Sequence, residues 1–135
     1  MKKLFAAVAL SASVFLATAP VAAHHAFAAE FDDKKPVVLK GKVTMVEWVN
    51  PHTWIHMDVT GPNGKVVNWK VEGGAPNALY RRGWNKTSVT IGSMITVDGF
   101  LAKDGTPTAN ARTVTLPDGR VVGAASSNGN AAADN

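Results

Sequence analysis

From Val37 onward, apolar and polar residues alternate with a period of two, in a segment rich in Val, Thr, Ile and Trp. This pattern is typical of β-strands that bury one face. In the first such segment, Leu39, Val43 and Met45 share the apolar face, and Gly41 predicts a bulge or a sharp bend. The pattern predicts strands over residues 37–48, 53–60, 66–72, 94–101 and 109–116, with a short extension at 120–122.

Turn signals separate these strands. Asn50-Pro51 ends the first strand, and the segment 61–64 joins the second and third as a hairpin. Pro76 suits the first turn of a helix and Gly83 the position just past its end, so a helix of about two turns should follow the third strand. This order predicts an all-β fold, a five-stranded OB-like Greek-key barrel with one short helix between strands three and four. Another small barrel or a sandwich is the alternative.

Four tryptophans fall on or near this pattern. Trp69 shares the apolar face of the third strand with Val67 and Val71, and we expect Trp69 and Trp84 in the core. In the second strand, Trp54 lies opposite the apolar face. Trp54 is therefore the tryptophan that we expect to be exposed.

The N-terminus has the pattern of a secretory signal. Lys2 and Lys3 precede about 14 mostly apolar residues, and small residues at Val21 and Ala23 suit a cleavage site. Serine, threonine and proline interrupt the run, so it is not the ~20-residue apolar stretch of a membrane anchor. We therefore expect a signal peptide (1–23), an N-terminal arm (24–36), one barrel domain (37–122) and a disordered tail (123–135), in a protein exported to the periplasm.

Composition narrows the chemistry. Removing Lys2 and Lys3 from 14 basic residues leaves 12 against 10 acidic ones, a net charge of +2, which gives no basic face for nucleic acid. The chain has no cysteine, so thiolate nucleophiles, disulfides and thiolate metal sites are excluded. A transition-metal site would use nitrogen and oxygen ligands, which suit Cu(II).

Cleavage after Ala23 would expose His24 as the first residue. Its amine and imidazole can chelate one ion, and a second imidazole, from His52 or His25, would complete a three-nitrogen site of the histidine-brace type. Cleavage after Ala22 would make His25 the third residue, an arrangement that also binds Cu(II). Solvated terminal histidines that bind copper only adventitiously are the alternative.

Further candidate ligand-binding residues are Trp54, His56, Arg81 and Arg82. On an extended strand His52 and His56 would lie roughly 13 Å apart, too far to share one ion. The two arginines could bind a carboxylate or phosphate, or they could complement the negative end of the helix. No nucleophile motif or phosphate loop is recognised, which favours a non-enzymatic domain.

The chain resembles an exported bacterial family known as domain of unknown function number sixty-one fifty-two. The motifs that carry the resemblance are His24-His25-Ala26-Phe27, Asn50-Pro51-His52 and Arg81-Arg82-Gly83-Trp84. The resemblance implies a small exported domain in the periplasm, and it provides no activity to carry over to this chain. The residues themselves leave three expectations open. The leading one is an accessory domain that binds a metal ion or a small ligand, with copper the best-motivated ion. The others are a metal-free module that binds an envelope protein or a saccharide, and a histidine-brace redox enzyme, for which the sequence indicates no substrate cleft.

Overall fold

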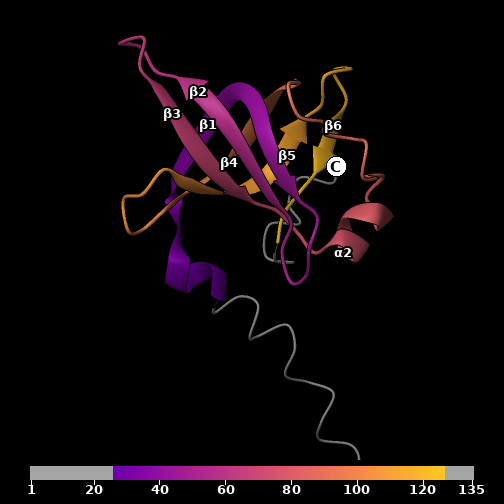
Figure 1. The fold of residues 1–135 in the computed structure, drawn as a ribbon. Coiled ribbons are helices and arrows are strands. Elements are labelled where there is room, and N and C mark those ends of the chain that lie inside the picture. Colours follow the sequence, from indigo (N-terminus) through magenta and orange to yellow (C-terminus); the bar gives the residue numbers. More distant parts are fainter. Residues whose placement is uncertain (1–25, 127–135) are drawn as a thin grey trace, which may run out of the picture.

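The computed structural model describes residues 26–126, so the predicted signal peptide, His24, His25 and the end of the predicted tail lie outside the described residues. A helical turn formed by residues 26–30, hereafter the N-terminal turn, leads directly into the first strand (Figure 1). The elements that follow are β1 (Phe31–Glu47), β2 (Trp54–Thr60), β3 (Val66–Glu72), α2 (Pro76–Arg81), β4 (Met94–Ala102), β5 (Thr108–Thr115) and β6 (Val121–Gly123).

The strands form one mostly antiparallel sheet in the order β3-β2-β1-β4-β5-β6. A parallel pairing of β3 with β5, from Lys70↔Thr108 to Glu72↔Asn110, joins the two ends of this order into a closed ring. The all-β fold class and the short helix after the third strand are therefore confirmed. The sheet has six strands because the extension near residue 121 pairs with β5 as β6.

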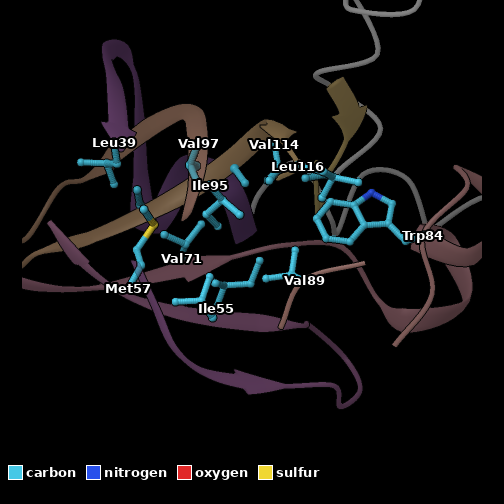
Figure 2. Close-up of a cluster of buried hydrophobic side chains, with 14 of the residues drawn as sticks. Leu39, Ile55, Met57, Val71, Trp84, Val89, Ile95, Val97, Val114 and Leu116 are labelled. Atoms are coloured by element: carbon cyan, nitrogen blue, oxygen red, sulfur yellow. The ribbon is translucent and has the colours of Figure 1, made fainter. Parts of the chain in front are cut away.

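One side of each strand points into the ring and builds the core (Figure 2). Ile55 and Met57 of β2 and Val71 of β3 are buried there, as the alternation predicted. Trp84 is 3% exposed, and its Nε1 donates to the Gly123 carbonyl oxygen at 2.8 Å. Trp69 is partly buried against the same cluster. Trp84 therefore lies in the core as expected, whereas Trp69 only packs against its edge.

The prediction of which β1 side chains face the core is wrong near the C-terminal end of the strand. Leu39 and Val43 are buried, but the register with β2 shifts between Val43 and Met45, and Met45 is 43% exposed. The extra residue of this bulge reverses the alternation, so Val46 packs against the core instead. The bulge does not lie at Gly41. At this glycine the backbone of β2 packs closely against β1, and a Cβ there would overlap the Asp58 carbonyl oxygen.

Both terminal segments are more ordered than the sequence pattern suggested. Residues 31–36 of the predicted arm belong to β1, where Phe31 is buried and pairs with Ala102. At the other end Gly123 closes β6, and Ala124 and Ala125 are buried. Residues 127–135 of the predicted tail lie outside the described residues. Apolar contacts thus hold residues on both sides of the predicted barrel boundaries.

Helix α2 begins at Pro76 and ends at Arg81, with Gly83 at φ +89° just beyond it, as the Pro and Gly positions predicted. Its Leu79 side chain is buried in the core. Figure 1 shows α2 lying apart from the N-terminal turn. Within residues 26–126, no helix has the length and hydropathy needed to cross a membrane.

Candidate functional site

Buried polar residues gather where β3 pairs with β5. Glu72 ends β3 on the outer side of the ring, because its neighbour Val71 points into the core. Asn110 lies directly opposite on β5 and is 0% exposed. The Asn110 Nδ2 donates to Glu72 Oε1 at 3.1 Å and to Ser126 Oγ at 2.6 Å. Three segments distant in sequence therefore share one polar cluster.

Glu72 and Ser126 of this cluster form one wall of a pocket of about 290 Å³, hereafter the His52 pocket. Its lining residues come from the N-terminal turn, the start of β1, the loop between β1 and β2, the start of β2, the end of β3 and the C-terminal segment. They are Ala26, Phe27, Glu30, Phe31, His52, Trp54, Glu72 and Ser126.

Glu72 is the most deeply buried ionisable group in the pocket, at 6% exposed. Burial raises the pKa of its carboxyl, because a charge is costly away from water. The neighbouring His52 and the hydrogen bonds from Ser126 and Asn110 oppose this rise, while the nearby Glu30 adds to it. The carboxyl is therefore poised to gain from a cation or a proton donor in the pocket.

His52 faces this carboxyl. Its Nδ1 lies 3.7 Å from Glu72 Oε1, which is longer than a hydrogen bond. Nδ1 is buried and has no hydrogen-bond partner among residues 26–126, and the same holds for the Asn110 Oδ1. Unpaired buried polar atoms are costly, so an occupant that bonds them would stabilise the site.

Close backbone packing places Asn110 at this position. At Gly99 of β4, a Cβ would overlap the carbonyl oxygen of Asn110 and lie 3.0 Å from its carbonyl carbon. Only glycine lets β4 approach β5 this closely. The register of the two strands also shifts between Asp98 and Gly99. The sequence of β4 thus sets the position of a site residue on β5.

The N-terminal turn is held firmly against the pocket. The Phe27 ring packs on Phe31 and Phe100, with centroids 5.7 Å and 5.9 Å apart. The Lys103 backbone N–H donates to the Glu30 carbonyl oxygen at 2.8 Å, and its Nζ donates to the Ala28 carbonyl oxygen. These contacts fix the place from which the chain continues toward His25 and His24, which lie outside the described residues.

A second pocket of about 420 Å³, hereafter the Lys103 pocket, adjoins the first and shares Glu30, Phe31 and Trp54 with it. Its other lining residues are Ala29, Ala102, Lys103, Asp104 and Thr108. Hydrogen bonds from the Thr106 hydroxyl and amide lower the pKa of Asp104, so that carboxylate stays charged. No local pattern predicts this pocket, because its walls come from β1, β2, β4, the β4–β5 loop, β5 and the N-terminal turn.

The structure brings together His52 and Trp54, two of the residues singled out from the sequence, in one pocket. Trp54 is half-buried, and the Lys70 Nζ lies 4.2 Å from the centroid of its ring. His56 lines neither pocket; its Nε2 bonds to Glu47 Oε2 at 2.7 Å. His56 therefore has a local ion-pair partner that accounts for its position.

The two arginines also lie outside both pockets. Arg82 Nη1 donates to the Ala125 carbonyl oxygen at 2.7 Å, which fastens the C-terminal segment to the end of α2. Arg81 is exposed in the last turn of α2, where a cation complements the helix dipole.

Sequence reasoning missed Glu30, Glu72, Asn110 and Ser126. One signal was present: Glu72 is a charged residue at the end of a strand, directly before Gly73-Gly74. In the part of the chain that the structure describes, no three His, Cys, Asp or Glu side chains cluster closely enough to hold a metal ion by themselves.

Fold and pockets together define a small all-β domain with a polar pocket between its two terminal segments. Residues 12–111 match a family described as a family of unknown function, DUF6152, and the chain belongs to this family. The resemblance stated from the sequence is thus confirmed at the level of the family. A search among curated proteins found no match.

Proposed function

We propose that this protein is an exported, non-enzymatic accessory domain that binds a divalent metal ion, with Cu(II) the best-suited ion, at the His52 pocket. The observation that carries this proposal is that Ala26 lines the same pocket as His52 and Glu72. The processed N-terminus would supply the remaining ligands.

Chain length supports this arrangement. His24 lies two positions before Ala26, and each step along the chain spans at most about 3.6 Å. His24 would therefore begin within about 7 Å of a residue that already lines the pocket. Its amine and imidazole would join the unpaired Nδ1 of His52, giving the three nitrogen ligands that Cu(II) favours. An α-amine has a pKa near 7.7–8.0, so it loses its proton to a metal at little cost near neutral pH.

Glu72 adds the charge that a cation needs. Its carboxylate oxygen lies 3.7 Å from the His52 Nδ1, and a divalent ion bound beside them would lower the cost of keeping that carboxylate charged. In this proposal Glu72 is either an oxygen ligand or the nearest counter-charge.

The fold belongs to the same proposal. Around the ring, neighbouring strands pair in the order β1-β2-β3-β5-β4, and α2 lies between β3 and β4 in the sequence. We take this arrangement as an OB-like Greek-key barrel. We further propose that the leader directs the domain to the periplasm. The alternative function is a metal-free module that contacts an envelope protein.

The test uses the secreted protein with its authentic terminus, in Cu(II) titrations followed by calorimetry and electron paramagnetic resonance. One extra alanine before His24, or His52→Ala, should weaken binding at least about tenfold and change the spectrum. His56→Ala is the matched control, because that histidine pairs with Glu47 outside the pocket. Equal affinity and equal spectra for all forms would overturn the proposal.

A further inference from the structure

The Lys103 pocket is the larger of the two pockets that meet at Trp54, and the metal-binding proposal does not use it. Its volume of about 420 Å³ falls in the range of small-ligand sites, which are commonly about 300–1,000 Å³. We infer that this pocket binds a pyranose saccharide, neutral or amino-bearing, stacked against Trp54. This inference does not depend on the proposed metal site.

Trp54 supplies an ordered aromatic surface. It sits at the start of β2, paired on one side with Glu47 of β1 and on the other with Glu72 of β3. The Lys70 ammonium lies over one face of its ring and further restrains the side chain, so a ligand would stack on the opposite face. The face of an indole carries partial negative charge and attracts the partly positive C–H groups of a sugar ring. A tryptophan fixed in this way pays little entropy when a ligand stacks on it.

The polar lining suits hydroxyl groups. Glu30 and Asp104 present carboxylate oxygens, which accept hydrogen bonds, and Thr108 presents a hydroxyl. A sugar hydroxyl can donate to the carboxylates while its oxygen accepts from the threonine. One aromatic surface with a few polar groups around it is the usual composition of a specific small-ligand pocket.

Charge selects among possible ligands. Glu30 and Asp104 line the Lys103 pocket, and Glu72 lies in the adjoining pocket. The one lysine in the lining, Lys103, already donates its Nζ to the Ala28 carbonyl oxygen. Both Lys103 and the Lys70 ammonium over Trp54 keep their charge, so three carboxylates face two ammonium groups. This excess of one carboxylate disfavours nucleic acids, phosphates and acidic sugars, and it favours ligands rich in hydrogen-bond donors.

The walls are formed before any ligand arrives. Phe27 packs on Phe31 and Phe100, and Lys103 bonds to the N-terminal turn through both its backbone and its side chain. Binding therefore requires no ordering of these segments, which preserves affinity.

The experiment measures binding of a glucosamine hexamer by calorimetry and tryptophan fluorescence, with a chelator present so that the result is independent of copper. We expect binding by the wild-type protein, a loss of at least about tenfold in Trp54→Ala, and an intermediate loss in Trp54→Phe. Tyr80→Ala is the control, since it removes an exposed aromatic side chain of α2 that lines neither pocket. A galacturonate hexamer should bind at least about tenfold more weakly than the glucosamine hexamer.

Circular dichroism establishes that each variant is folded, and Thr108→Val provides a second probe of the pocket should Trp54→Ala unfold. That variant should bind several-fold more weakly than wild type, because it keeps the shape and loses the hydroxyl. Absence of wild-type binding, or equal binding by Trp54→Ala, would overturn the inference. Equal affinity for the two hexamers would overturn its charge argument and with it the ligand class.

Discussion

Replacing Gly99 by alanine should destabilise the domain and disturb the site at the same time. The new Cβ would overlap the Asn110 carbonyl oxygen and lie 3.0 Å from its carbon, inside the 3.4 Å at which ordinary contact begins. The obstacle is backbone of a neighbouring strand, so a side-chain rotation cannot relieve it. Strand β5 must move away from β4.

The cost can be worked out from this movement. Overpacking costs about 1–3 kcal/mol, and weakening one or two ladder hydrogen bonds near Gly99↔Ala111 adds about 1 kcal/mol each. The lower entropy of the unfolded alanine chain returns at most about 1 kcal/mol. We expect a net loss of about 1–5 kcal/mol, or a fall of roughly 4–20 °C in Tm for a domain of this size.

Urea and thermal unfolding measure this loss, and Gly73→Ala is the matched control. At Gly73 the closest atom to a new Cβ would be the Ala124 carbonyl oxygen at 3.5 Å, an ordinary contact. Gly73→Ala should stay within about 0.5 kcal/mol of wild type. In Gly99→Ala, amide chemical shifts of Asn110 and Glu72 should also move, because the polar cluster shifts with β5. A Gly99→Ala protein as stable as the control, with those shifts unchanged, would refute the close-packing argument.

Three further predictions concern single side chains. In metal-free protein, burial places the folded pKa of Glu72 above its unfolded value, so stability is greatest below the unfolded pKa and falls as pH rises through the folded pKa. Glu72→Gln should remove this loss, so its stability relative to wild type in urea unfolding should increase as the pH rises above the ordinary carboxyl value of 4.5; parallel curves for the two proteins would contradict it. Trp84→Phe leaves the Gly123 carbonyl oxygen unpaired and a void in the core, and should cost about 2–3 kcal/mol by the same assay; a loss below about 0.5 kcal/mol would show that the bond is unimportant. Arg82→Ala removes the bond to the Ala125 carbonyl oxygen and should speed amide hydrogen exchange in residues 124–126 while leaving β2 protected; equal exchange rates in wild type and variant would contradict it.

Local pattern was enough for most of the strands. The segment 66–72 coincides with β3, and the apolar side of β2 was correct, because both depend on alternation within one strand. Alternation failed at Met45, since a bulge is created by the pairing of β1 with β2 and leaves no mark on the residue order. The alternation of apolar and polar residues, together with the turn residues, therefore predicts strands and helices well and irregular strand pairings poorly.

The polar site could be predicted only in part. His52 and Trp54 stood out because their residue types are informative wherever they occur. Glu72 did not stand out, because its place in the polar cluster depends on Asn110 and Ser126. These residues lie 38 and 54 positions further along the chain. A parallel contact between β3 and β5 unites them, and no local pattern specifies that contact.

The hydrogen bond between Asn110 and Ser126 also has a consequence for biosynthesis. Ser126 contributes to one wall of the His52 pocket, so a nascent chain that has been synthesised only as far as β5 has an open, incomplete pocket. The wall closes only when the segment that follows β6 has been made and has packed against Asn110, so the pocket is among the last parts of residues 26–126 to form during synthesis.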